Sequence, residues 1–373
     1  MSTRFKNGWI LSPRADALVF AGPLVLSGIL VLWFHRAGRL HDEMPAWAFA
    51  LLVVGCDVAH VWSTLFRTYL DPEERRRNGA RLAGVPLLCF TASLALLFAD
   101  GSGLLFWRVL AYVAAFHFVR QQFGWMAYSA RRAGETSRLD RRLDALAIYN
   151  ATVFPLLWWH ANLPRAFDWF VRGDFVQGVP PWAATAGHAL HWTINGVYLA
   201  RQAWLFASGR GVNAAKLLVW VTTWAAWYGG IVLLDSDIAF TATNVLSHGI
   251  PYFAIVHRWG RARWDGESGA IARVFRPGAW PLFYAPLAAI AFAEEGAWDR
   301  LVWHDHGGLF LGPSVTLSPA PLAVVVALLA TPQATHYVLD AWLWRTGRTN
   351  PDLARRLGFT GTGPPTAAPP QRG

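Results

Sequence analysis

The stretch PAPLAVVVALLATPQATHYVLDAWLW (319–344) is the clearest indication of the fold class of this 373-residue chain. As one α-helix, this apolar stretch is long enough to cross a hydrocarbon core of about 30 Å. Gln333, His336 and Asp340 follow one another at intervals of three and four residues, so they share one face of that helix. An apolar helix with a polar stripe predicts a membrane span that packs around a polar site.

The composition of the whole chain also indicates lipid as its solvent. Hydrophobic residues make up 54% of the sequence and charged residues 15%, and the mean hydropathy is +0.28. Soluble domains carry about a quarter charged residues, and the 22 Trp fit a protein with two membrane interfaces. The net charge of +10 does not indicate nucleic acid, because the Arg residues form short blocks between apolar runs. Cys56 and Cys89 both lie in apolar stretches and predict no disulfide framework.

Ten runs are long enough to cross a membrane. They lie at about 17–34, 46–69, 82–99, 104–130, 143–162, 182–206, 217–234, 238–257, 280–297 and 319–344. The first run has the length of a full span and lacks a small-residue cleavage site, so we interpret it as a retained helix and not as a signal peptide.

The basic residues of the loops give an independent test of this count. Lys and Arg number 24 on the side that holds both termini and 5 on the other side, with no exception in the alternation. Because cytoplasmic loops carry the excess of Lys and Arg, both termini are predicted to be cytoplasmic. We therefore expect an all-α, multi-pass bundle over 1–346 in a bacterial inner membrane. The Pro- and Gly-rich segment 347–373 is expected to be a disordered cytoplasmic tail.

Polar side chains gather in the even-numbered spans, at spacings of three, four or seven residues that form one stripe per helix. These stripes contain Asp57, His60, Thr64 and Arg67; His117, Gln121 and Tyr128, with Arg120 and Gln122 beside them; His188, His191, Asn195, Tyr198 and Gln202; Thr241, Asn244, His248 and Tyr252; and Gln333, His336 and Asp340. Five of the spans thus present histidines at a similar depth, roughly 9–15 residues or about 14–22 Å from their inner ends.

Histidines at one depth predict a shared metal or haem site. Neutral imidazole is the commonest transition-metal ligand, and a site inside lipid favours neutral ligands. The predicted ligands are His60, His117, His188, His191, His248 and His336. A single histidine in a membrane helix can equally well do no more than hydrogen-bond a neighbouring helix.

Other polar residues of the stripes are candidates for chemistry beside the metal. Asp57 and Asp340 lie one turn from a histidine, so each is predicted to be a ligand or an acceptor that orients one. The alternative is an ion pair with Arg67 or Arg120. The candidate catalytic residues are Asp57, Asp340 and Arg120, and the candidate cofactor-binding residues are Arg67, Gln121, Asn195, Asn244 and Tyr252.

The element His336-Tyr-Val-Leu-Asp340 resembles the HxxLD-type element of the Brp/Blh-type carotene dioxygenases. Those are bacterial multi-pass proteins with histidines scattered singly over their spans, and the chain more generally resembles uncharacterised His-rich multi-pass bacterial membrane proteins. The resemblance covers five residues and implies that His336 and Asp340 belong to a metal site. The HxxxH and HxxHH clusters of the membrane di-iron desaturases and hydroxylases do not occur in this sequence.

Three functions fit these patterns. The first is a membrane-embedded metal-dependent oxidoreductase or oxygenase, with non-haem iron, that acts on an apolar, lipid-like substrate. The second is a b-type haem or quinone-linked redox protein with two axial histidines. The third is a transporter or proton relay in which His, Asp and Arg titrate in a cavity.

Overall fold

In the computed structural model, which describes residues 5–347 and 350–359, the chain is all-helical. Its long helical segments are α1–η1–α2 (Pro13–Asp16, Ala17–Ala21, Gly22–Arg36), α3–η2–α4 (Ala46–Phe49, Ala50–Val58, Ala59–Arg67), α5 (Pro72–Ala99), α6 (Leu104–Arg132), α7 (Arg138–Ala161), α8 (Pro181–Ala207), α9–η3 (Ala214–Trp227, Tyr228–Leu233), α10 (Asp237–Arg263), α12–η4 (Trp280–Trp298, Asp299–Trp303) and α13 (Pro319–Leu343). The short helices α11 (Ala270–Val274) and α14 (Leu353–Arg356) complete the set.

Each predicted span coincides with one of these helical segments. Five of them are long and apolar enough to cross a membrane: Pro13–Arg36, Ala46–Arg67, Pro72–Ala99, Ala214–Leu233 and Pro319–Leu343. The helices α6, α7, α8, α10 and α12 also match predicted ranges but are more polar. By their length and composition these helices indicate a membrane protein, and the count of ten spans stays a prediction.

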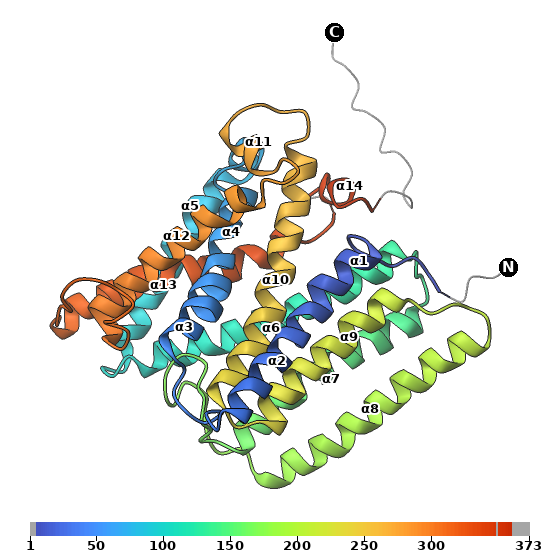
Figure 1. Ribbon diagram of the computed structural model, residues 1–373, viewed down its shortest axis with the longest axis horizontal. Coiled ribbons are helices and arrows are strands. Elements are labelled where there is room, and N and C mark those ends of the chain that lie inside the picture. The colour runs from blue at the N-terminus through green and yellow to red at the C-terminus, as the bar shows by residue number, and fades with distance from the viewer. Residues whose placement is uncertain (1–4, 348–349, 360–373) are drawn as a thin grey trace.

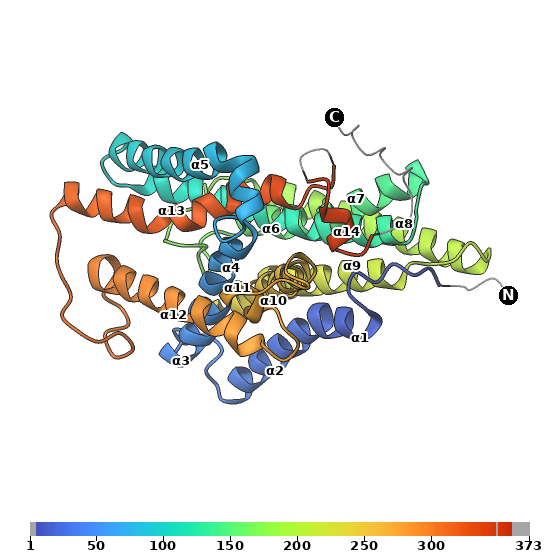
Figure 2. The same cartoon turned by 90° about the horizontal axis from the view of Figure 1, so that it is seen from above.

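The helices form a layered bundle with α10 near its centre (Figure 1). Seen from above (Figure 2), α5 and α13 lie along one side, α1 to α3 along the opposite side, and α4 and α10 between them. The helix α8 packs on α7 at the edge of the bundle, away from α10 and α13. This position decides which of the predicted polar stripes can meet.

One segment of π-helix, η2, precedes α4 within a single span. A π turn pairs each residue with the fifth one along the chain, and such segments are frequent at functional sites. The carbonyl of Gly55 in η2 accepts a hydrogen bond from the Tyr284 hydroxyl at 2.7 Å. Gly249 of α10 lies so close to η2 that a Cβ there would be 2.7 Å from the sulfur of Cys56 and 3.0 Å from its carbonyl oxygen. The absence of a side chain at Gly249 thus lets α10 approach the π-helical segment.

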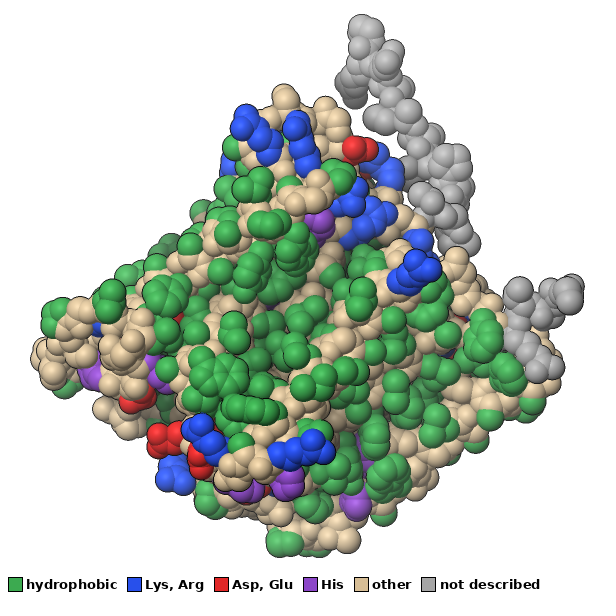
Figure 3. Space-filling model, viewed as in Figure 1, with side chains coloured by type: hydrophobic (Ala, Val, Ile, Leu, Met, Phe, Trp, Pro, Cys, Tyr) green, Lys and Arg blue, Asp and Glu red, His purple; other side chains and the backbone are tan. Residues whose placement is uncertain are grey.

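Charged residues gather at the two ends of the bundle. On the face shown in Figure 3, a broad hydrophobic band separates a rim rich in Lys and Arg, around α11 and the end of α10, from a smaller mixed rim near the loop between α2 and α3. Ion pairs at the basic end join Arg67 to Glu74 at 2.9 Å and Arg263 to Asp71 at 3.0 Å. These pairs hold the ends of neighbouring helices together.

The segment after α13 turns back onto this basic end. Leu353 and Leu357, in and just after α14, are each only 1% exposed and join the apolar cluster around Trp259. They belong to the range that the sequence predicts as a tail, while 348–349 and 360–373 lie outside the described residues.

Candidate metal centre

Four of the predicted ligands meet inside the bundle. His60 of α4, His117 of α6, His248 of α10 and His336 of α13 are buried, and one nitrogen of each lies within 4.8 Å of the others. Their residues are 1%, 7%, 0% and 1% exposed, respectively. This convergence from four helices is compatible with a metal site.

The four imidazole rings form a closed cycle. The His60 ring contacts those of His248 and His336, with centroids 4.6 and 4.9 Å away, and the His117 ring contacts the same two at 5.0 and 4.8 Å. Neighbouring rings stand at 65 to 86° to one another. In this cycle His60 lies opposite His117 and His248 lies opposite His336.

The spacing of the cycle can be compared with ideal coordination. With a metal–nitrogen distance of about 2.1 Å, neighbouring ring centroids are about 4.6 Å apart in a square arrangement and about 5.3 Å apart in a tetrahedral one. The observed range of 4.6 to 5.0 Å is closer to the square.

Several ring nitrogens of the cycle lack, among the described residues, the partners that buried polar groups normally have. The Nε2 atoms of His60 and His248 face each other at 3.1 Å. Among the described residues, Nε2 of His117 and Nε2 of His336 have no hydrogen-bond partner. Unpaired buried nitrogens that converge on one point are what a cation would satisfy, so these residues fit a transition metal.

A chain of hydrogen bonds anchors the Nδ1 side of the His336 ring. Its Nδ1 lies 2.7 Å from the Thr64 hydroxyl, which lies 3.1 Å from the Tyr252 hydroxyl, and Tyr252 donates to Asp340 at 2.6 Å. When Nε2 presents its lone pair to the centre, Nδ1 carries the proton and donates to Thr64, which then donates to Tyr252. Every donor in the chain finds one acceptor, and the chain ends on a carboxylate. The chain therefore fixes the ring orientation and tautomer that ligation requires.

The two aspartates of the centre lie behind neighbouring ligands. Asp57 is 3.7 Å from Nδ1 of His60, and Asp340 is 3.9 Å from Nδ1 of His336. Four neutral imidazoles leave the full charge of a divalent cation uncompensated in a low-dielectric interior. Two carboxylates beside the ligands supply the opposite charge without occupying a coordination position.

Aromatic side chains close the remaining sides of the cycle. The Phe118 ring stacks on His248, with centroids 3.6 Å apart and an interplanar angle of 8°. The Tyr337 ring lies 4.8 Å from that of His117. From α6, the Gln121 amide reaches the backbone carbonyl of His248 at 3.4 Å. Aromatic carbons thus cover His117 and His248, while polar side chains surround His60 and His336.

The other two predicted ligands, His188 and His191, do not join the cycle. They lie on α8, where both rings pack on Phe154 of α7. Nε2 of His188 meets the hydroxyl of Tyr228 in η3 at 3.0 Å, and Nε2 of His191 accepts from Trp224 of α9 at 3.0 Å. The physical reason is the edge position of α8, whose polar stripe faces α7 and not the central helices. Asn195, a predicted cofactor-binding residue, belongs to this second cluster and meets His191 at 3.0 Å.

The remaining predicted site residues are divided between the centre and the rest of the bundle. Arg120 hydrogen-bonds Tyr149 of α7, and Arg67 pairs with Glu74 at the basic end, so neither arginine pairs with Asp57 or Asp340. Asn244 is one helical turn from His248 on α10, and its Oδ1 is buried without a partner among the described residues, as is Nδ1 of His248. Tyr252 and Asp340 belong to the centre.

Sequence reasoning missed three residues that touch the ligands. Thr64 lies on the same stripe as His60 but is not among the predicted site residues. Its spacing of four residues from His60 is the signal that could have identified it. Phe118 and Tyr337 each follow a ligand directly in the chain. No periodic pattern separates such aromatic residues from those that face lipid.

No known protein-family model matches the sequence, and no curated protein or solved structure matches it either. The chemistry of the centre is therefore argued from its own residues.

Proposed function

We propose that the protein is a membrane-embedded, metal-dependent oxidoreductase, most simply an iron oxygenase, that acts on a lipid-soluble substrate. The cycle of His60, His117, His248 and His336 carries this proposal, since its nitrogens lie within 4.8 Å of one another and are buried. These four side chains would hold the metal. When bound, such a metal supplies open coordination positions for dioxygen or for substrate activation.

The ligand arrangement favours a redox metal over structural zinc. Structural zinc sites are closed and tetrahedral, with four protein ligands at equal angles. The ring spacings of 4.6 to 5.0 Å instead favour a flattened set. Four equatorial imidazoles would suit a metal that prefers six ligands, such as ferrous iron, better than one that prefers four.

The same spacings argue against haem. A porphyrin held by two axial histidines needs a wide slot between the two rings, because the macrocycle lies perpendicular to both bonds. Here each imidazole contacts two others at 5.0 Å or less between centroids. Rings in mutual contact leave no such slot, which favours a bare ion.

The protein residues around the centre have roles that follow from their chemistry. Thr64, Tyr252 and Asp340 orient His336, and Asp57 compensates charge beside His60. Phe118 and Tyr337 exclude water and offer apolar contacts to a hydrocarbon substrate. A site deep in an apolar bundle is reached most easily by a substrate that is already dissolved in the bilayer.

For topology, we propose ten spans with both termini in the cytoplasm of a bacterial inner membrane. The support is the distribution of Lys and Arg, 24 against 5 in alternate loops. Reporter fusions after residues 75 and 100 report opposite sides of the membrane if this proposal is right. If both fusions report the same side, the number of spans proposed for the first half of the chain is wrong.

One preparation tests the proposed function. The protein is purified in detergent, its metals are quantified, and its visible spectrum is recorded. We expect about one iron per chain without a Soret band, as for a single non-haem site. His117→Ala is expected to lose the iron, whereas His35→Ala, at an exposed residue in the last turn of α2, keeps it. A Soret band would instead assign haem, and a purified protein with only zinc or no metal would refute the proposal.

The reaction class is tested separately in membranes. Cells that produce the wild-type protein or His336→Ala are given isotopically labelled dioxygen, and their lipid extracts are compared by mass spectrometry. We expect labelled products in the wild type only. Equal labelling in both extracts would contradict an oxygenase while leaving the metal result intact.

A further inference from the structure

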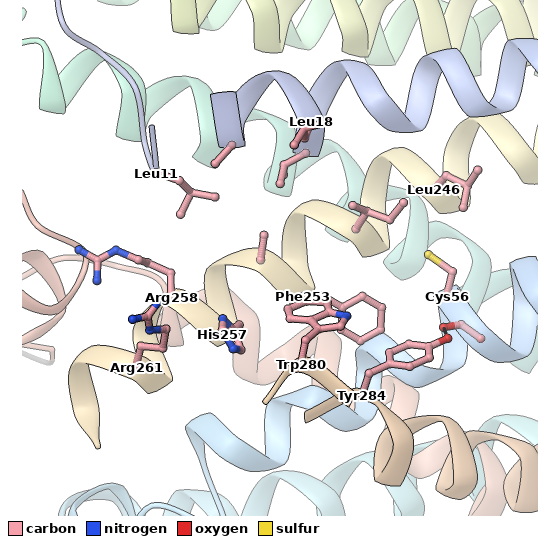
Figure 4. Close-up of a pocket in the computed structure, with 15 residues that line it drawn as sticks. Leu11, Leu18, Cys56, Leu246, Phe253, His257, Arg258, Arg261, Trp280 and Tyr284 are labelled. Carbon is pink, nitrogen blue, oxygen red and sulfur yellow. Dashed lines mark hydrogen bonds between the residues drawn. The ribbon is translucent and has the colours of Figure 1, made fainter. Parts of the chain in front are cut away.

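A long groove runs along the face of α10 that points away from the histidines. Its volume is about 640 Å³, and its walls come from four parts of the chain: α1–η1, η2, α10 and α12 (Figure 4). At one end Cys56 and Leu246 line it, and at the other end Arg258 and Arg261. Between these ends the lining is mainly apolar, and its polar side chains are Tyr284, whose hydroxyl is bonded to the Gly55 carbonyl, and His257 beside the basic end.

The rims of the groove are apolar and outward-facing. Leu18 on one rim is 73% exposed, and Trp280 on the other is 44% exposed. In a membrane these side chains face hydrocarbon, so the groove opens to the bilayer and not to water. An occupant can therefore enter sideways from the lipid.

The basic end of the groove carries unpaired charge. Among the described residues, neither the Arg258 nor the Arg261 guanidinium has a hydrogen-bond or carboxylate partner. On the next turn, by contrast, Arg263 pairs with Asp71 at 3.0 Å and with Glu267 at 2.5 Å. Two adjacent cations with no counter-ion in the part of the chain that the structure describes, at the end of an apolar groove, match an anion that is attached to a hydrocarbon tail.

We propose that this groove binds one acidic glycerophospholipid of the bilayer. Its phosphate lies between Arg258 and Arg261, and one acyl chain follows α10 to Cys56. From Arg261 back to Leu246 the helix rises about 22 Å, which exceeds the roughly 15 Å of one hydrocarbon leaflet. The groove therefore accommodates a whole acyl chain, and its basic end lies where the headgroups of the cytoplasmic leaflet are expected.

The site stands apart from the proposed metal centre. Gly55 and Cys56 line the groove, while Asp57 and His60, a few residues on, belong to the centre. On α10, Leu246 and Phe253 line the groove, whereas His248 and Tyr252 face the histidine cycle. The lipid and the metal thus contact different residues of the same two elements, and the lipid proposal does not depend on which metal binds.

Native mass spectrometry of the full-length, delipidated protein tests the proposal. The probes are dioleoylphosphatidylglycerol and dioleoylphosphatidylcholine, which share their acyl chains and differ in headgroup charge. We expect the wild type to retain one phosphatidylglycerol with at least tenfold higher affinity than phosphatidylcholine. In Arg258→Gln/Arg261→Gln the ratio of the two affinities should fall to about one. The matched control Arg273→Gln/Arg276→Gln removes two exposed arginines outside the groove and should keep the preference.

Two further variants separate tail binding from headgroup binding. Arg261→Gln alone, on an exposed residue, should reduce the preference severalfold even if the double variant does not fold. Ala15→Trp fills the groove from its rim and should weaken the binding of both lipids, because the new side chain displaces the acyl chain. Soluble glycerol phosphate should not displace phosphatidylglycerol from the protein, even at concentrations at which the lipid itself would saturate the groove. Equal loss in the Arg273→Gln/Arg276→Gln control, an unchanged preference in the groove variants, or competition by glycerol phosphate would each overturn the proposal.

Discussion

The Nε2 atoms of His60 and His248 face each other at 3.1 Å, although 188 residues separate the two histidines in the chain. Two imidazole nitrogens at this distance share either one proton or one cation. Because His117 and His336 complete the cycle around them, the shared-cation arrangement accounts for all four rings at once. The closeness depends on the approach of α10 to η2 at Gly249.

Gly249→Ala is therefore expected to weaken metal binding by about 10- to 100-fold, the range seen when the supports of a ligand are disturbed. The added Cβ would meet the Cys56 carbonyl oxygen at 3.0 Å and push α10 away from η2. Chelator competition on the purified protein measures the affinity. Gly196→Ala, on α8 with nothing within 4 Å of its Cβ position, is the control and should bind as the wild type does. Equal affinities of all three proteins would contradict this role of Gly249.

Thr64→Val is expected to lower metal affinity by about 10- to 100-fold while the protein stays folded. It removes the hydroxyl that accepts from Nδ1 of His336 at 2.7 Å and connects that ring to Tyr252. Thr64→Ser keeps the hydroxyl and should restore most of the affinity. Thr193→Val, which removes only a bond to its own helix, is the matched control. The prediction fails if the Ser and Val variants at position 64 bind metal equally well.

Substitution of the α8 histidines should leave the metal content unchanged. His188 and His191 are bound by Tyr228 and Trp224 and lie outside the cycle. Both His188→Ala and His191→Ala are therefore expected to retain about one metal per chain, and His191→Ala should lower the melting temperature because its ring is fully buried. Metal analysis beside a thermal melt separates these effects. Loss of metal in either variant would place a ligand on α8.

Removal of the metal is expected to destabilise the protein. A ligand present at a thousand times its Kd stabilises the native state by about 4 kcal/mol. Chelation should therefore lower the Tm of the wild type and leave that of His117→Ala nearly unchanged. The measurement is a thermal melt in detergent with and without chelator. A chelator-induced shift of the same size in His117→Ala would show that the effect arises elsewhere.

The ion cluster around Lys216 is expected to support stability and not function. Its ammonium is 2.6 Å from Glu135 and 2.9 Å from Asp144, and its side chain is 2% exposed. Lys216→Met leaves two carboxylates without their cation and should cost about 3–5 kcal/mol of folding free energy. The triple variant Lys216→Met/Glu135→Gln/Asp144→Asn should recover part of this loss. Denaturant or thermal unfolding measures both, and metal content in the surviving folded fraction should not change.

The sequence predicted the helices well because each is bounded by local signals. Apolar runs, charged loops and proline positions act within a few residues, so the helical segments match all ten predicted ranges. It also predicted the stripe on each helix, and hence Asp57, His60, His117, His248, Tyr252, Asp340 and His336 near one site.

The arrangement of the stripes could not be predicted in the same way. Whether His191 meets His248 depends on which helices are neighbours, and depth in the membrane carries no information about lateral position. The helix α8 has a stripe as regular as that of α10, yet it lies at the edge of the bundle. The π-helical conformation of η2 could not be predicted either, because no residue type in 50–58 requires it.

The π-helical segment η2 sets the rotational phase of the span that contains His60. In an α-helix each residue turns the chain by about 100°, so one residue more or fewer redirects every side chain beyond it. Removal of one residue from η2 would therefore rotate the two halves of the span relative to each other. Either His60 would leave the cycle, or the groove-lining residues Gly55 and Cys56 would leave the face of α10. The length of the π-helical segment thus couples the angular positions of two binding sites that share one helix.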